Sequence, residues 1–424
     1  MPWPIRPVPP DPHVTYTRYR PASWAQILIG AAIAGLSLGT LVTAFWSGSV
    51  AGGNEYRLWR WQTDTLLDNV FSRIGIGPDP DTEAADRAVR NYFRLTTQIR
   101  NESDKDAPDL KLLETLAAER ALFENDVERY VEGRIHETVE AAGLTRSLPL
   151  FTSARIVWPP VDFELTTPPR LLVRSPREKI ERAGDTLLKP GIDLAEIERL
   201  EEKSSNDDTA TLVVAIGGLA AYPAMVTADR SYGSLVDTAS HEWVHHYLAF
   251  YPLGEQWGKG GDAETLNETT ANIAGREIAA LILRAHPIEL SSGEDGRRSQ
   301  VRPVTVDFNK EMRALRLEVD RLLAAGQVDQ AEALMEEKRR FLEDGGIFIR
   351  KINQAYFAFY GTYADGAASS NPVGPKIERV WELTKDVGRF LAVMREVTNV
   401  RDLDDALNLL ESGAVGRGVI PTSP

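Results

Sequence analysis

The sequence predicts an α+β protein that is mostly helical and carries one apolar segment near its N-terminus. Apolar residues recur at helical spacing among charged residues over 82–142 and 308–344, which is the pattern of amphipathic helices. Short apolar runs at 149–175 and 209–226 are instead separated by prolines or glycines, which is typical of strands. Residues 25–46 contain no charged side chain, so this segment is long enough and apolar enough to span a bilayer.

Composition limits the class of protein. A chain of 424 residues, 43% of them hydrophobic, can bury a sizeable core. The formal net charge of −14 argues against a nucleic-acid partner, because nucleic-acid binding needs basic patches. The chain contains no cysteine, which excludes thiolate ligands, disulfides and cysteine nucleophiles. Any bound metal must therefore be held by histidine and carboxylate side chains.

The N-terminal region predicts a membrane-anchored, single-pass protein. Residues 1–23 are rich in proline and predict an unstructured tail. Residues 24–46 predict one transmembrane helix, with Trp24 and Trp46 at the two interfaces and the lipid bilayer as a partner. The excess of arginine before this helix favours an N-terminus inside and places the bulk of the chain on the extracytoplasmic side. A cleaved signal peptide is the alternative, and the length of the apolar segment favours the anchor.

Two segments are expected next. Residues 47–145 predict a glycine-containing flexible linker, up to about residue 55, and then a helical segment with a break near 106–108. Residues 146–290 contain the predicted strands, a helix near 194–203 and the candidate site.

The apolar stretch 209–226 is too short for a second membrane span and contains Gly217, Gly218 and Pro223. Its Val, Ile and Thr residues favour strand. We expect two strands joined at the glycines, which would bring a sheet edge up to the helix that follows.

Residues 291–424 predict a C-terminal helical subdomain. Its helices are expected over 308–344, with a turn at Gly326, and over 375–397 and 403–412. Between them lies a stretch rich in aromatic residues, most of which are expected in the core. One tyrosine of this stretch is expected to donate its hydroxyl to a developing oxyanion. The sequence does not choose among Tyr356, Tyr360 and Tyr363.

The most specific signal is His-Glu-Trp-Val-His-His at residues 241–246, which holds three of the six histidines of the chain. His241 and His245 are four residues apart, so on a helix they share one face and can reach one cation. Glu242 lies beside them, where it can accept a proton from a metal-activated water. His246 points away from that face and is expected to pack or to form a hydrogen bond.

A catalytic zinc site needs a third protein ligand and an open position for water. The glycines and the proline between residues 251 and 261 predict a loop that turns the chain back. A second helix starting near Ala263 would then present Glu268 to the first. Glu264, one turn earlier on the same face, and Asp262 are the alternatives. If Glu264 is not a ligand, we expect it either to form a hydrogen bond to a ligand or to be exposed to solvent.

The run Asn267-Glu268-Thr269-Thr270-Ala271 after His-Glu-x-x-His resembles the gluzincin group of zinc metallopeptidases. The resemblance implies that Glu268 is the glutamate ligand. It also implies a zincin-like core, a small sheet beside an active-site helix pair, whose sheet edge accepts an extended substrate as an added strand. Asn272 falls where the group often has an aspartate that orients a histidine ligand, and it brings no charge. With Ile352-Asn353-x-Ala355 and Tyr363, the chain is also similar to bacterial putative aminopeptidases.

Together these features predict a membrane-anchored zinc metallopeptidase that acts on peptide or protein substrates. His241, His245 and Glu268 would hold Zn²⁺, and Glu242 would be the general base. The alternatives are a non-peptidase zinc hydrolase, a partner-binding membrane protein, and a catalytically degenerate zincin-like scaffold, which the uncharged Asn272 favours.

Overall fold

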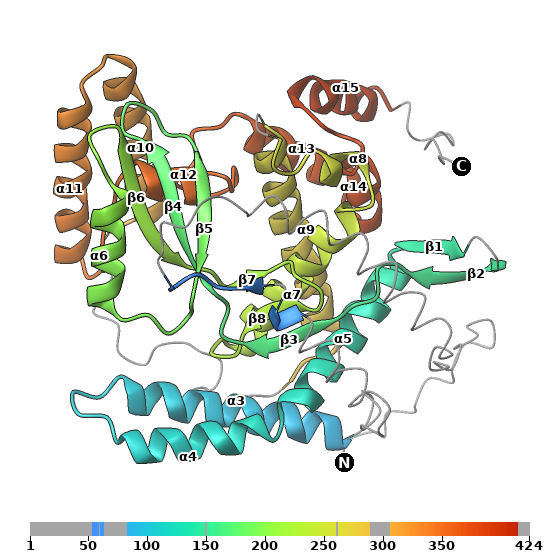
Figure 1. Cartoon of the computed structure of the whole chain (residues 1–424). Helices are drawn as coiled ribbons and strands as arrows, with labels where there is room; N and C mark the ends of the chain where they lie inside the picture. Colours follow the sequence, from blue (N-terminus) through green and yellow to red (C-terminus); the bar gives the residue numbers. More distant parts are fainter. Residues whose placement is uncertain are drawn as a thin grey trace, which may run out of the picture.

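The computed structural model describes residues 53–58, 60–62, 83–148, 151–259, 262–288 and 306–413. The predicted tail, residues 1–23, and the predicted transmembrane helix, residues 24–46, lie outside the described residues. Among the helices that are described, none combines the length and the apolar character of a membrane span. Helices predominate and surround small sheets (Figure 1), which confirms the predicted α+β, mostly helical class.

Three helices follow in the sequence, and the first two lie side by side at one end of the molecule (Figure 1). They are α3 (Glu83–Ser103), α4 (Leu110–Ala121) and α5 (Glu124–Ala141). The break predicted near residues 106–108 lies between α3 and α4, where the side chain of Asp109 accepts the first backbone N–H groups of α4. The sequence pattern did not predict the further break between α4 and α5.

The described strands form a hairpin and two three-stranded sheets. The hairpin pairs β1 (Thr145–Leu148) with β2 (Phe151–Val157). In the first sheet β4 (Arg170–Pro176) is antiparallel to both its neighbours, β5 (Gly184–Leu188) and β6 (Thr209–Ala215). In the second sheet β8 (Ala224–Thr227) is parallel to β3 (Phe163–Thr166) and antiparallel to the end strand β7 (Gly218–Leu219).

The stretch 209–226 therefore contributes to both sheets. The prediction of two strands joined at the glycines was wrong, because β6 ends at Ala215 and Gly218 belongs to β7. The stretch forms three strands: β6 pairs with β4, whereas β7 pairs with β8, which also pairs with β3. The predicted sheet edge beside the next helix is confirmed, since β7 is an end strand and packs on that helix.

Helices cover both faces of the sheet β5-β4-β6 (Figure 1). Leu172 packs with α6 (Leu194–Ser204) on one face, whereas its neighbours Leu171 and Val173 pack on the other, as the alternation of side chains along a strand requires. The helices on that other face are α10 (Phe308–Ala324), α11 (Val328–Asp344) and α12 (Gln354–Tyr360). Gly326 turns the chain between α10 and α11 with φ +71°, as predicted.

A second core surrounds the helix pair α7 (Tyr232–Leu248) and α9 (Ala263–Ala285). The other elements of this region are α8 (Pro252–Glu255), α13 (Val373–Thr384), α14 (Val387–Met394) and α15 (Val400–Glu411). The prediction of one helix over 375–397 was wrong, because Lys385 adopts a left-handed conformation with φ 48° and ends α13 there.

Residues 54 and 55, predicted as the end of a flexible linker, lie instead along the edge of β5 together with Tyr56. The backbone N–H of Tyr56 donates to the carbonyl of Leu187 at 3.0 Å, and the N–H of Lys189 donates to the carbonyl of Asn54 at 2.8 Å. The segment therefore adds a short pairing to that sheet edge and carries the chain toward the cavity described below.

Candidate metal centre

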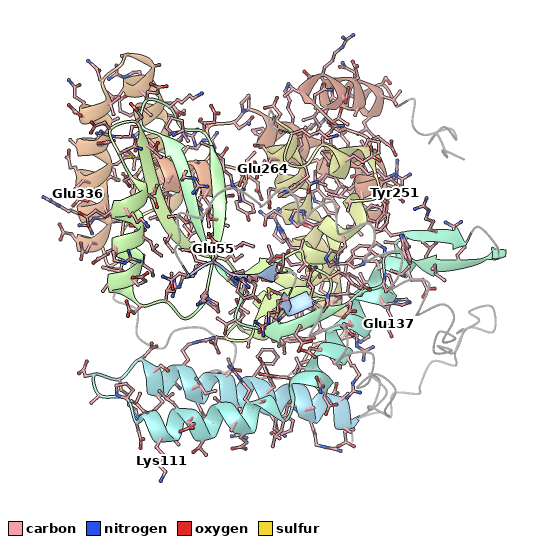
Figure 2. All side chains as sticks on the ribbon, viewed as in Figure 1. Glu55, Lys111, Glu137, Tyr251, Glu264 and Glu336 are labelled. Carbon is pink, nitrogen blue, oxygen red and sulfur yellow. The ribbon has the colours of Figure 1, made fainter. Side chains whose placement is uncertain are left out.

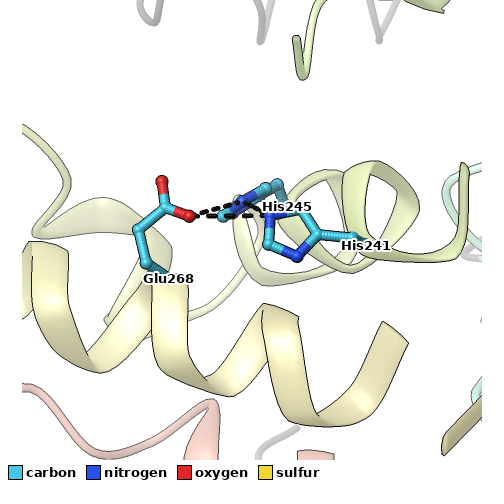
Figure 3. A group of neighbouring side chains, drawn as sticks. All are labelled: His241, His245 and Glu268. Atoms are coloured by element: carbon cyan, nitrogen blue, oxygen red, sulfur yellow. Dashed lines mark hydrogen bonds and ion pairs between the residues drawn. The ribbon is translucent and has the colours of Figure 1, made fainter. Parts of the chain in front are cut away.

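Two histidines of α7 and one glutamate of α9 point toward one another (Figure 3). The Nε2 atoms of His241 and His245 lie 3.0 Å apart. Each of them lies 3.5 Å from Oε2 of Glu268. The predicted helical spacing accounts for the histidine pair, because residues four apart project from one face of a helix.

A close approach of the two helices brings Glu268 to this face. A Cβ atom on Gly275 would lie 2.8 Å from the backbone nitrogen of His241, which is closer than real contacts allow. Glycine is therefore required where α9 crosses α7 beside the first histidine. The second helix begins at Ala263, where the sequence predicted it, and Glu268 lies in its second turn.

The donor atoms of His241, His245 and Glu268 all lie within 4.8 Å of one another. Oε2 of Glu268 is buried and has no hydrogen-bond partner among the described residues. A buried carboxylate oxygen without a donor is costly unless a cation compensates it. Two imidazole nitrogens and one carboxylate oxygen are donors that zinc and related transition metals take. The three residues could hold such an ion.

Asn267 orients His245, a role that sequence reasoning missed. The Nδ1–H of His245 donates to Oδ1 of Asn267 at 2.8 Å, and Asn267 is almost fully buried. A proton on Nδ1 leaves the lone pair on Nε2, the atom that faces Glu268. The sequence signal that could have revealed this role was the position of Asn267 directly before Glu268. Two consecutive residues of one helix can both reach the neighbouring helix.

His245 and Glu268 each shift the pKa of the other toward the charged form. Burial alone would lower the pKa of His245, but the negative charge of Glu268 outweighs it and raises the pKa to about 9. Burial likewise would raise the pKa of Glu268, but the charge of His245 and the close contacts with both histidines lower it far below the usual range. The site therefore retains a positive charge beside Glu268, which a proton supplies when no metal ion does.

Glu242 lies beside the cluster and is buried. A Cβ atom on Gly218 would lie only 2.2 Å from its Oε1, so the carboxylate rests directly on the bare backbone of β7. Burial raises the pKa of Glu242, although the two neighbouring histidines counteract this. A carboxyl group with a raised pKa is suited to accept a proton and release it again.

A cavity of about 520 Å³ contains this cluster. Its walls come from β7 and the loop after it, from α7 and α9, and from the end of α12 with Tyr363 after it. Leu58 and Gln62, which follow the segment that runs along β5, also line the cavity. The cavity is large enough for several residues of a peptide.

The three candidate tyrosines lie in different places. Tyr363 and Tyr360 line the cavity, whereas Tyr356 is buried and packs on Tyr360 outside the lining. The charge of Glu268, and then burial, raises the pKa of Tyr363 well above its usual range, and a hydrogen bond to Glu268 adds to this. The N–H of Ala364 donates to Oγ1 of Thr269 at 2.9 Å, which fixes this loop to α9.

The alternative third ligands take other roles. Glu264 binds the guanidinium of Arg182 with an oxygen–nitrogen distance of 2.6 Å, and Figure 2 labels it in the region between the sheets and α9. Arg182 also binds Asp185 at 2.5 Å. Asp262 precedes α9 and its side chain makes no capping hydrogen bond. Among the described residues, the group that could hold a metal contains neither Glu264 nor Asp262.

Asn272 does not meet a histidine of the cluster through any hydrogen bond in the described part of the chain. Its Nδ2 donates to Oδ2 of Asp365 at 2.6 Å, and Arg276 lies 3.4 Å from the same oxygen. Asn272 still lines the cavity. The negative charge that Asn272 lacks is therefore present next to it, on Asp365.

His246 faces away from the cluster, as its position on the helix predicted. Its Nε2–H donates to the carbonyl of Ala221 at 2.6 Å, and its ring packs against Tyr222. Burial lowers the pKa of His246 to about 4. The neutral imidazole thus ties the loop after β7 to α7.

Comparison of the chain with models of protein families, with curated proteins and with solved structures finds no match.

Proposed function

We propose that this protein is a zinc-dependent peptidase of the gluzincin type. The observation that carries the proposal is the geometry of one cluster: His241, His245 and Glu268 direct three metal donors at one point, and the buried Glu242 lies beside them in the same cavity. A ligand triad with an adjacent carboxylate is the arrangement that metal-assisted hydrolysis needs.

Each residue has a distinct role in this proposal. A bound zinc ion supplies an activated water and polarises the carbonyl that is attacked. Glu242 accepts the proton of that water and passes it to the leaving amine. Tyr363, whose raised pKa keeps its hydroxyl protonated, donates a hydrogen bond to the oxyanion. Asn267 keeps Nε2 of His245 available for the metal.

We propose that the substrate peptide binds along the edge of β7. It is the end strand of its sheet, and it lies against Glu242. An extended peptide can pair with such an edge through main-chain hydrogen bonds, which would bring its carbonyl groups to the cluster. This favours a peptide substrate over other substrates of a zinc hydrolase.

We further propose that residues 24–46 anchor the protein in a lipid bilayer, with the catalytic region on the extracytoplasmic side. A chain anchored in this way stays in the membrane fraction at alkaline pH and leaves it in detergent. Release at alkaline pH without detergent would contradict the anchor.

Replacing Glu242 by Gln tests the proposal. We expect hydrolysis of a peptide library to fall roughly 10²- to 10⁴-fold, since a general base contributes that much, while the zinc content is unchanged. Glu277→Gln, the same substitution on the other helix of the pair, α9, and outside the cavity lining, is the control. Unchanged hydrolysis in Glu242→Gln would contradict the mechanism. A chain that binds zinc but cleaves no peptide would favour another zinc hydrolase.

A further inference from the structure

Two arginines line the cavity, and they differ in how their charge is compensated. Arg182 binds both Asp185 and Glu264. Arg230 takes part in no ion pair among the described residues, and its buried Nε has no hydrogen-bond partner there. Arg230 is thus a cation in the cavity whose hydrogen-bonding capacity is not used by the described part of the protein.

The backbone next to Arg230 is shaped to receive its side chain. A Cβ atom on Gly217 would lie 1.9 Å from Nη2 of Arg230. The next residue, Gly218, makes the same kind of space for Glu242. Because both glycines lack a side chain, the guanidinium of Arg230 packs against Gly217 and the carboxylate of Glu242, the proposed general base, packs against Gly218.

Residues of α3 and α4 hold the loop that carries Arg230 in place. The hydroxyl of Tyr92 donates to the carbonyl of Ala228 at 2.9 Å. Arg120 binds the carboxylate of Asp229 at 2.6 Å. Asp229, the acidic neighbour of Arg230 in sequence, is therefore engaged by another arginine. Asp237 lines the cavity too, but forms no ion pair with Arg230 in the described structure.

We propose that Arg230 binds a carboxylate of the substrate, supplied by the C-terminus of a peptide or by an Asp or Glu side chain. The assignment rests on the proposed peptidase function and deepens it. A planar guanidinium binds a carboxylate through two parallel hydrogen bonds. Because Gly217 and Gly218 are neighbours, and an extended peptide advances about 3.3 Å per residue, the carboxylate should lie within about two residues of the bond that is cleaved.

Three hexapeptide mixtures with matched neutral residues test this on the full-length, zinc-loaded chain in detergent. The first has a free C-terminal carboxylate, the second a C-terminal amide, and the third a C-terminal amide and one internal Glu. Hydrolysis is measured as kcat/KM. Binding of the same mixtures is measured on Glu242→Gln, which separates recognition from chemistry.

The variants are Arg230→Gln and Gly217→Ala, which displaces the guanidinium without removing its charge. Arg100→Gln is the control, because Arg100 lies outside the cavity lining and donates to the carbonyl of Asp229 on the loop that carries Arg230. Zinc content and melting temperature of every variant report whether it folds.

We expect the original chain to prefer at least one carboxylate mixture over the neutral amide by roughly 10- to 100-fold, the effect of a charged hydrogen-bonded pair. The preferred mixture identifies the source of the carboxylate. Arg230→Gln and Gly217→Ala should abolish the preference mainly through KM, and Arg100→Gln should retain it.

Equal cleavage and binding of all three mixtures by the original chain would overturn the role of Arg230. A preference that survives in Arg230→Gln, or a loss that is equal for every mixture, would do the same. Absence of any hydrolysis together with carboxylate-dependent binding would instead contradict the peptidase function and leave the recognition role supported.

Discussion

At the scale of single residues, the site depends on which atom of each side chain is left free. Asn267 occupies Nδ1 of His245 and so exposes Nε2. Arg182 forms an ion pair with Glu264, so Glu268 is the carboxylate that faces the histidines. Which residues could hold a metal therefore follows from the hydrogen-bond partners of their neighbours as much as from the proposed ligands themselves.

Replacing Asn267 by Ala should weaken zinc binding roughly 10- to 100-fold, because His245 loses the acceptor that fixes its tautomer. Competition with a chelator measures the affinity. Asn272→Ala removes an amide of the same helix that binds Asp365 instead, and it should change the affinity less. A larger effect of Asn272→Ala than of Asn267→Ala would show that the second asparagine orients the site.

Zinc binding should also depend on pH. Since the charge of Glu268 raises the pKa of His245 to about 9, the imidazole of the metal-free protein carries a proton at neutral pH, which the metal must displace. The pKa of Glu268 is lowered, so this carboxylate has no proton to lose. The apparent affinity should rise about tenfold per pH unit between pH 7 and 9 and then level off. An affinity independent of pH over this interval would rule out the displaced proton.

At the scale of elements, the crossing of α7 and α9 positions the cluster. Helical periodicity predicted both helices and the shared face of His241 and His245. It did not reveal Asn267 as the partner of His245, because spacing along one helix does not specify the rotation of the other. Nor did it reveal that Arg182, in the β4–β5 turn, captures Glu264. Contacts between residues so distant in sequence leave no local pattern.

Gly275→Ala tests this crossing. The added Cβ would meet the backbone of His241 at 2.8 Å, so the helices must separate. We expect the free energy of unfolding to fall by about 1–3 kcal/mol and zinc affinity to drop with it. Chemical unfolding and zinc titration measure the two effects.

The matched control is Gly233→Ala in the first turn of α7. Its Cβ would lie 3.6 Å from a side-chain carbon of Leu283, an ordinary contact, and alanine favours a helix over glycine by about 1 kcal/mol. This variant should be as stable as the original chain or more stable. Equal behaviour of the two variants would contradict a special role of the crossing at Gly275.

At the scale of the whole molecule, the cavity lies where two hydrophobic cores meet. Leu171 and Leu187, from the core under the sheet β5-β4-β6, line it together with polar residues of α7 and α9. The apolar residues of these two helices belong to the other core. Composition and periodicity predicted the mostly helical α+β class. They did not predict that the stretch 209–226 would be divided between two sheets, because pairing partners are chosen by the fold and not by strand propensity. That division places Gly217 and Gly218 at the cavity.

The most direct test of the central claim is the number of zinc ions bound per full-length chain, measured by elemental analysis after zinc is supplied and excess removed. We predict about one zinc in the original chain and in Glu264→Gln, whose position binds Arg182, and none in Glu268→Ala. Absence of zinc in the original chain, or zinc retained in Glu268→Ala and lost in Glu264→Gln, would contradict the proposed metal centre.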